Sequence, residues 1–175
     1  MNSLREATAE AHRAAEQTDI VKLIFSKQIN KQQYASLLAN QLLYYSAMEK
    51  RGSIFSKLEN AARTESIITD IIELSESDLK ISQLSYEYSE YLLTISDKQL
   101  WAHIYTHYLG DLAGGQMLKR CVPGSGKRFE FKDSAELISQ IRMNVSIADA
   151  TEANCAFDWT IRIYNELYSR IREIS

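Results

Sequence analysis

Proline is almost absent from this chain of 175 residues, because Pro123 stands alone and only six glycines accompany it. Proline and glycine interrupt helices more readily than other residues, so a chain poor in both favours long helices. Apolar residues recur at helical spacing along most of the sequence, and no segment alternates strictly between apolar and polar residues as a half-buried strand does. The sequence therefore predicts an all-α fold.

Helix start signals divide the chain into segments. Ser3, Asn30 and Ser96 each precede a Glu or Gln by three residues, which is the pattern of a capping box. We expect helices over 4–16, from 31 to a stop near Gly52, over 64–74, from 86 to about 95, from 97 to about 120, from 133 or 134 through Arg142, and from about 151 to 174. Segments 75–85 and 122–131 are expected to be connections. We expect these segments to form one helical bundle domain, residues 1–175, of about six to eight helices.

Composition excludes several classes of partner. The net charge of −3 gives no reason to expect nucleic acid or an anionic membrane. No apolar run approaches the roughly 20 residues that span a bilayer, and the N-terminus leads directly into a helix signature instead of a signal peptide. Cys121 and Cys155 do not make a disulfide framework. We therefore expect a cytoplasmic protein with reduced thiols and no membrane contact.

The segment from Tyr105 to Gln116 contains Gly110, Gly114 and Gly115 within an otherwise helical pattern. Each glycine costs up to about 1 kcal/mol relative to alanine inside a helix, so another interaction is expected to offset the loss. Gly110 and Gly114 lie four residues apart and share one helix face. Spacing alone leaves two interpretations open: close packing against another helix or a kink, or a kinked helix that covers a planar ligand.

Two pairs of side chains are candidates for metal chemistry. His12 lies four residues before Glu16, so the carboxylate can hold one imidazole N–H while the other nitrogen binds a metal; an ordinary surface or core pair is the alternative. His103 and His107 are also four residues apart and could bind a metal directly. The Glu-x-x-His signature of di-iron bundles is missing, as are Cys-x-x-Cys, a phosphate loop and a nucleophile elbow.

Two segments together resemble the heme oxygenase family. Residues 4–16, LREATAEAHRAAE, are similar to its proximal helix, whose histidine binds the heme iron. Residues 105–116, YTHYLGDLAGGQ, are similar to its distal helix. The similarity extends to residues 45–49, YSAME, and to residues 153–157, ANCAF. The soluble cyanobacterial and phage-like members look most similar.

The resemblance implies an enzyme that holds heme b, as substrate and cofactor, between these two helices. O2 and external electrons would cleave the ring to biliverdin, Fe²⁺ and CO. His12 would be the ligand of the heme iron and Glu16 would orient its ring. On the other face Gly110 and Gly114 would leave room for O2, and Asp111 would order the waters that deliver protons.

The resemblance also implies a wider set of site residues. Tyr45 and His107 would belong to the distal network, with Tyr88 as a further candidate. Arg5 and Arg142 would bind the heme propionates, because guanidinium groups pair well with carboxylates. The remaining heme contacts would be Thr8, Tyr105, Gly115, Phe157 and Tyr164. Phe25, Phe157 and Tyr164 are equally well explained as ordinary core.

No flavin or nicotinamide motif is present, so the electrons are expected from an external donor, and ferredoxin is the expected partner. Basic residues that follow the distal segment could attract an acidic ferredoxin or simply be solvated loop charge: Lys119, Arg120, Lys127, Arg128 and Lys132.

The chain departs from the family pattern at several positions. His107 stands where the distal helix usually has Arg, Ala9 where the first helix often has Lys, and Thr160 where the last helix has Asn. A basic position before Arg142 is also lost, and the loops near 52–64 and 142–151 are short. Two other functions stay open: a heme-binding protein of the same fold without turnover, and a non-heme metal enzyme that uses His103 and His107.

Overall fold

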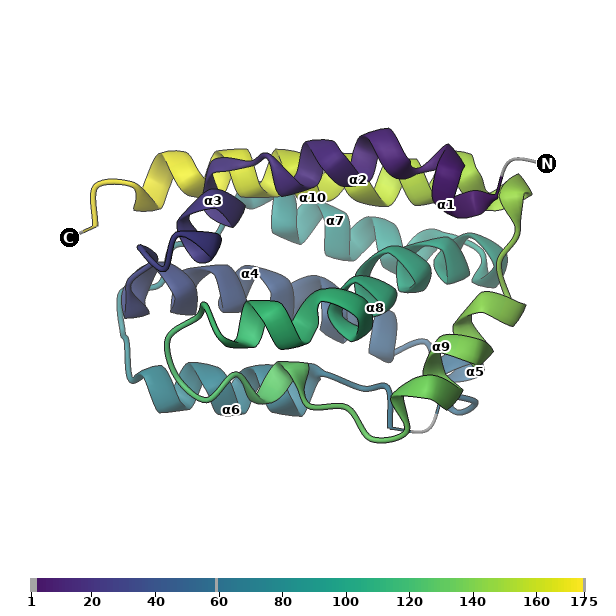
Figure 1. Ribbon diagram of the computed structural model, residues 1–175, viewed down its shortest axis with the longest axis horizontal. Coiled ribbons are helices and arrows are strands. Elements are labelled where there is room, and N and C mark those ends of the chain that lie inside the picture. Colours follow the sequence, from purple (N-terminus) through teal and green to yellow (C-terminus); the bar gives the residue numbers. More distant parts are fainter. Residues whose placement is uncertain (1–2, 59, 175) are drawn as a thin grey trace.

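The computed structural model describes residues 3–58 and 60–174, and it confirms the all-α prediction, because no β-strand occurs among these residues. The helices are α1 (Leu4–Ala7), α2 (Ala9–Glu16), α3 (Asp19–Phe25), α4 (Lys31–Glu49), α5 (Gly52–Phe55), α6 (Thr64–Leu74), α7 (Gln83–Thr94), α8 (Asp97–Lys119), α9 (Ser134–Met143) and α10 (Ala150–Ile171). Two short 3₁₀ turns, η1 (Lys127–Phe129) and η2 (Ile147–Asp149), lie before α9 and α10. Figure 1 shows their arrangement.

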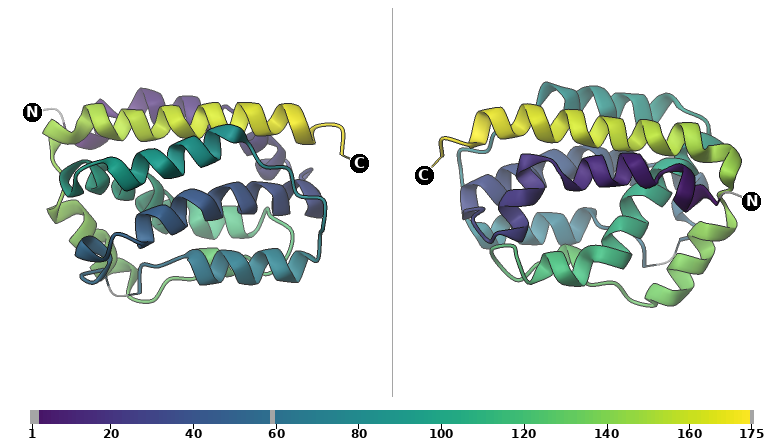
Figure 2. Two further views of the ribbon diagram at one scale, coloured as in Figure 1. Left: turned by 180° about the vertical axis from the view of Figure 1, so that it is seen from behind. Right: turned by 45° about the horizontal axis from the view of Figure 1, so that its top comes forward.

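Helix α4 lies at the centre of the bundle and packs against α6 and α7, while α10 runs along one edge and packs against α8 and α2 (Figure 1). Seen from behind, α10, α7, α4 and α6 are nearer the viewer, and α2 and α8 lie beyond them (Figure 2, left). Helices α2 and α8 therefore lie on the same side of the molecule. Helix α8 bends along its length in both figures.

The predicted capping boxes are confirmed at Ser3, Asn30 and Ser96. In each, the side-chain oxygen of the cap accepts a hydrogen bond from the backbone N–H three residues later, and the Glu or Gln at that position accepts from the backbone N–H of the cap. Two otherwise unpaired backbone donors are satisfied in this way at each helix start. These local signals fix where α1, α4 and α8 begin.

Other helix boundaries differ from the prediction. Thr8 separates α1 from α2, and its Oγ1 donates to the carbonyl of Leu4 at 2.9 Å, which competes with continuous helix. Gly52 begins α5 instead of only ending α4, and α7 starts at Gln83, three residues before the expected position, because the Ser82 hydroxyl caps it. Helix α3 was not predicted. The described residues therefore form ten α-helical segments instead of six to eight.

The core is rich in tyrosine as well as in aliphatic side chains. The largest fully buried side chains include five tyrosines: Tyr34, Tyr44, Tyr45, Tyr88 and Tyr108. The hydroxyls of Tyr45, Tyr88 and Tyr108 make hydrogen bonds in the middle of the bundle, whereas the buried Tyr34 hydroxyl has no partner among the described residues. Burial raises the pKa of Tyr45 and Tyr88 well above the usual value, so both stay protonated donors at neutral pH.

Two further features concern the thiols and the length of the apolar helices. Cys121 and Cys155 are free thiols. None of the helices in the described ranges is both long enough and apolar enough to cross a membrane.

Asn40 holds the connection between α6 and α7 against α4. It is fully buried, and its Nδ2 donates to the carbonyls of Ser36 at 2.7 Å and Lys80 at 2.8 Å. Its Oδ1 accepts from the backbone N–H of Ser82 at 2.8 Å and from the Ser85 hydroxyl at 2.7 Å. One side chain therefore satisfies polar groups on three segments, which fixes α7 beside α4.

We predict that Asn40→Ala lowers the free energy of unfolding by about 2–4 kcal/mol, because two or more buried polar groups lose their partner at about 1–3 kcal/mol each. Urea unfolding of the heme-free protein measures the change. The control is Gln32→Ala, which removes an exposed hydrogen bond to the carbonyl of Asp78 and should cost less than about 1 kcal/mol. Equal losses in the two variants would contradict the structural role of Asn40.

Candidate active site

His12 and Glu16 lie on α2, and about half of each side chain is exposed, 53% and 52% respectively. His12 Nδ1 lies 3.6 Å from Glu16 Oε2. Phe157 from α10 meets the imidazole edge-on, with ring centroids 5.7 Å apart. Because the carboxylate lies beside Nδ1, the ring is set up to offer Nε2 to a ligand. The structure thus brings together three residues that the sequence analysis had selected.

The glycines of α8 divide into two kinds. A Cβ added to Gly110 or Gly114 would meet no atom within 4 Å, so both glycines border open space. A Cβ added to Gly115 would lie 2.9 Å from Cδ1 of Phe129. Close packing is therefore confirmed at Gly115, and the interpretation that Gly110 and Gly114 face a planar ligand stays a prediction. Gly115 allows η1 to pack closely, whereas Gly110 and Gly114 leave the backbone of α8 open.

Asp111 is buried beside these open glycines. Its Oδ2 accepts a hydrogen bond from the Tyr45 hydroxyl at 2.6 Å and another from Nη2 of Arg128 at 2.8 Å. The Tyr45 hydroxyl also lies 3.4 Å from the carbonyl oxygen of His107. The predicted pair of Asp111 and Tyr45 is therefore in direct contact.

Arg128 is the partner that the sequence analysis missed. It was expected on the surface as part of a basic patch, and that expectation is wrong, because only 2% of the residue is exposed. Its Nη1 donates to Oε1 of Gln41, whose Nε2 donates to the Tyr164 hydroxyl at 2.9 Å. Burial by itself lowers the pKa of Arg128, but attraction to Asp111, Tyr45 and Tyr34 and the hydrogen bond to Asp111 together raise it by more, so the guanidinium stays charged.

A second buried chain of hydrogen bonds connects α10 to α8. Glu152 Oε1 lies 2.8 Å from His103 Nε2, His103 Nδ1 lies 2.6 Å from the Tyr88 hydroxyl, and that hydroxyl lies 2.9 Å from His107 Nε2. Glu152 also accepts from the Tyr91 hydroxyl at 2.6 Å. Burial raises the pKa of Glu152, but these hydrogen bonds lower it by more, so Glu152 is a carboxylate at neutral pH.

This series of hydrogen bonds determines which ring nitrogens of His103 and His107 carry protons. Burial lowers the pKa of His103, and it lowers the pKa of His107 to about 3, so both rings are neutral at pH 7. A carboxylate at Glu152 requires His103 to donate from Nε2 and to accept from Tyr88 at Nδ1. We infer that Tyr88 in turn accepts from Nε2–H of His107, which leaves Nδ1 of His107 as an acceptor.

The same geometry bears on the non-heme alternative. His103 and His107 both make hydrogen bonds to the Tyr88 hydroxyl, so one nitrogen of each ring already has a protein partner. In the part of the chain that the structure describes, no group of three or more His, Cys, Asp or Glu residues could hold a metal ion. The spacing that suggested a metal pair instead places His103, His107 and Asp111 on the inner face of α8.

The remaining predicted residues lie outside these two networks. Arg5 and Arg142 are exposed on α1 and α9. Thr8 is buried and bonds within its own turn, and Tyr105 packs beside the small cluster formed by Leu4, Ala102 and Ala153. Phe25 is largely exposed and Thr160 is buried. In the expected basic patch, Lys119 and Lys127 both pair with Glu130, at 2.6 Å and 3.2 Å.

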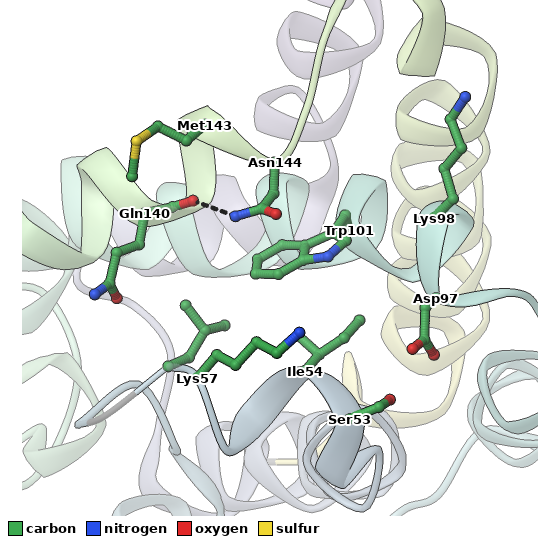
Figure 3. Close-up of a pocket in the computed structure, with 10 residues that line it drawn as sticks. Ser53, Ile54, Lys57, Asp97, Lys98, Trp101, Gln140, Met143 and Asn144 are labelled. Carbon is green, nitrogen blue, oxygen red and sulfur yellow. Dashed lines mark hydrogen bonds between the residues drawn. The ribbon is translucent and has the colours of Figure 1, made fainter.

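A cavity of about 410 Å³ lies elsewhere, between α5, α8 and α9 (Figure 3). Trp101 lies across it, between Asn144 on one side and Ile54 and Lys57 on the other. Its lining residues are Ser53, Ile54, Lys57, Leu58, Asp97, Lys98, Trp101, Gln140, Met143 and Asn144. None of them belongs to the candidate site, so this cavity is separate from it.

Comparison with known proteins points to one family. The family model described as heme oxygenase matches residues 1–163. The heme oxygenase of Pyropia yezoensis is 30% identical over 205 residues, which cover 96% of this chain and 85% of that protein. Heme oxygenase 1 of Nostoc sp. is 30% identical over 201 residues, covering 95% of this chain and 84% of that protein. The crystal structure of heme oxygenase-1 from the cyanobacterium Synechocystis sp. in complex with heme superposes with a TM-score of 0.84 and 27% identity, over 97% of this chain and 92% of that one.

The two kinds of glycine give a first prediction for the site. Gly114→Ala should raise the free energy of unfolding of the heme-free protein by up to about 1 kcal/mol, because helix propensity rises and the new Cβ meets no atom. The matched variant Gly115→Ala should lower it, because the new Cβ collides with Phe129. Thermal or urea unfolding measures both. A gain in Gly115→Ala as large as in Gly114→Ala would refute the distinction.

A second prediction concerns pH. The folded protein takes up a proton at His107 only near pH 3, whereas the unfolded chain does so near 6.5. Below about pH 6.5 the unfolded state therefore binds more protons, and His107 should destabilise the fold by about 1.4 kcal/mol for each further pH unit down to about 3. His107→Gln should lose less stability than the wild type between pH 7 and 4. The control Gln32→Ala removes an exposed hydrogen bond and no titratable group, so its stability should depend on pH as that of the wild type does; the same pH dependence in all three proteins would contradict the prediction.

Proposed function

The chain belongs to the heme oxygenase family, and from this we propose that heme binds between α2 and α8 and is opened there. The protein is a heme oxygenase, an oxidoreductase that makes biliverdin. The observation that carries the proposed location is the open backbone at Gly110 and Gly114 of α8, next to the buried Asp111. Helix α2, to which His12 belongs, lies on the same side of the molecule as α8 (Figure 2).

The residues present fit heme. His12 offers one imidazole nitrogen while Glu16 lies beside the other, and this is the second-sphere arrangement that orients a metal-binding histidine. Gly110 and Gly114 form a surface without side chains that a planar ring can approach. Bound heme supplies both the iron at which O2 and electrons react and the ring that is opened.

On the proximal side we assign His12 as the ligand of the heme iron. Glu16, whose Oε2 lies 3.6 Å from Nδ1, orients the imidazole. Phe157 contacts the ring edge-on and limits its rotation. This contact supports a cofactor-binding role for Phe157 over an ordinary core role.

On the distal side we assign Asp111 as the residue that orders proton-carrying waters. Tyr45 and Arg128 both donate to its Oδ2, so its other oxygen is left for water. Gly110 and Gly114 keep bulky side chains away from the space that O2 needs. His107 contributes a neutral ring whose Nδ1 is left to accept a hydrogen bond from water.

We assign the other predicted residues to the walls of the pocket. Arg5 and Arg142 are exposed and available to pair with the heme propionates. Gly115 acts by letting Phe129 pack against α8, and Thr8 acts by separating α1 from α2. Tyr105 and Tyr164 complete the set, with Tyr164 joined to Arg128 through Gln41.

We propose O2 as the oxidant and ferredoxin as the electron donor. Arg120 and Lys132 remain exposed near the end of α8 and the loop that follows, and they offer positive charge to an acidic partner. The attraction is weaker than the sequence suggested, since Arg128 is buried and Glu130 pairs with two of the lysines. The two free thiols fit the reducing cytoplasm.

Addition of hemin to the purified protein tests the function. A Soret band followed by biliverdin formation on supply of reduced ferredoxin, or of ascorbate, is the expected result. A Soret band without biliverdin would indicate a heme-binding protein without turnover. Absence of a Soret band would overturn heme as the substrate.

We predict that His12→Ala still takes up heme through its contacts with α2 and α8 but loses the spectrum of a histidine-ligated iron. Added imidazole should restore that spectrum, because the small ligand can enter the space left by the side chain. The control is His103→Gln, which alters a buried histidine that contacts Tyr88 and Glu152. A normal spectrum in His12→Ala together with a changed one in His103→Gln would show that His12 is not the ligand.

A further inference from the structure

Arg128 is held at Asp111 from both sides of its backbone. Its N–H donates to Oδ2 of Asp70 on α6 at 2.9 Å, and its carbonyl accepts from Nη1 of Arg63 at 3.2 Å. The neighbouring N–H of Lys127 donates to the other oxygen of Asp70 at 2.7 Å. The backbone of η1 is therefore fixed independently of the contact that the Arg128 side chain makes with α8.

The guanidinium of Arg128 is directed at the distal network. Nη2 lies 2.8 Å from Asp111 Oδ2 and 3.2 Å from the Tyr45 hydroxyl, and Nη1 binds Gln41. Its Nε is buried and has no hydrogen-bond partner among the described residues. A buried N–H without a partner costs stability. The side chain of Arg128 therefore bonds through Nη1 and Nη2 even though its Nε–H stays unpaired.

These contacts fix the orientation of the Asp111 carboxylate. Two donors, from α4 and from η1, meet on Oδ2, and that fixes the rotation of the carboxylate. No residue in the described ranges donates to Oδ1. The carboxylate therefore uses one oxygen for the protein and keeps the other for solvent.

We propose that Arg128 is a positioning residue for heme cleavage, which fixes the Asp111 carboxylate so that Oδ1 orders the distal waters. The inference rests on the proposed function, in which those waters deliver protons. Arg128 does not touch heme in this proposal; it acts only through Asp111 and Tyr45. The competing explanation is that Arg128 merely fastens η1 to the bundle.

Arg63 provides a matched comparison. It is also a buried arginine, with 6% of the residue exposed, and its Nη1 binds the carbonyls of Arg128 and Glu130 in the same loop. It makes no contact with Asp111 in the described structure; its guanidinium lies over the ring of Phe131 instead. Removal of Arg63 therefore weakens the loop attachment without changing the partners of Asp111.

The first measurement uses the heme-free protein. The Tyr45 hydroxyl proton, which lies in a 2.6 Å hydrogen bond to Asp111, is identified in the proton NMR spectrum by its loss in Tyr45→Phe. Arg128→Met should shift or broaden this resonance, because Asp111 Oδ2 loses its second donor. Arg63→Met should leave it in place. Equal changes in both variants would support the fastening role and overturn the proposal.

The second measurement uses the heme complex. At saturating heme, Arg128→Met should make biliverdin about 10–100-fold more slowly, with a heme affinity within about twofold of the wild type, whereas Arg63→Met should turn over normally at a temperature where it is folded. In an Asp111→Asn background, Arg128→Met should add little further loss, because both changes remove the same function. Independent, multiplicative losses would overturn the proposal.

Arg128→Met leaves Asp111 buried without its cation, so folding itself is at risk. If that variant does not fold, Arg128→Lys and the double variant Arg128→Met/Asp111→Asn carry the test, since neither leaves an unpaired buried charge. Lys has a single point of donation, so Arg128→Lys should move the Tyr45 resonance and slow turnover several-fold. An unmoved resonance with wild-type turnover in Arg128→Lys would overturn the proposal. If the wild type makes no biliverdin, the proposed function fails, and the NMR comparison still decides whether Arg128 positions Asp111.

Discussion

The ion pair between Asp111 and Arg128 is the contact on which the organisation of the site depends. Burial of either charge alone would cost several kcal/mol, so each requires the other to be in place. Because Tyr45 donates to the same carboxylate oxygen, the pair joins α4, α8 and η1 at one point. The position of the loop after α8 is therefore coupled to the orientation of the carboxylate inside the bundle, and a change in one is expected to alter the other.

Helix α8 meets two requirements on its two faces. The inner face carries His103, His107 and Asp111 at four-residue spacing, and all three are buried in hydrogen-bond networks. The second requirement is a stretch of backbone without side chains, and Gly110 and Gly114 provide it where α8 borders open space. The glycines reduce helix propensity, and the buried contacts of the inner face keep the helix in place despite that loss.

The sequence predicted what depends on local interactions. The capping boxes at Asn30 and Ser96 fixed the starts of two long helices, because cap and partner lie only three residues apart. Contacts between distant segments were not accessible in the same way. Arg128 reaches Gln41 across 87 positions, and its place after two glycines is typical of a solvated loop. The four-residue spacing of His103 and His107 likewise did not predict that both rings would bind the Tyr88 hydroxyl, because Tyr88 lies on another helix.

The distal network also shows how a cation can be supplied by a different element. His107 occupies a helix position where a neutral ring is imposed by burial and by the Tyr88 hydroxyl, so that position gives Asp111 no positive charge. The charge comes instead from η1, whose backbone is held by Asp70 on α6. A change in that loop therefore reaches the inner face of α8 through the Asp111 carboxylate, which depends on the packing of η1 against α6 for its cation.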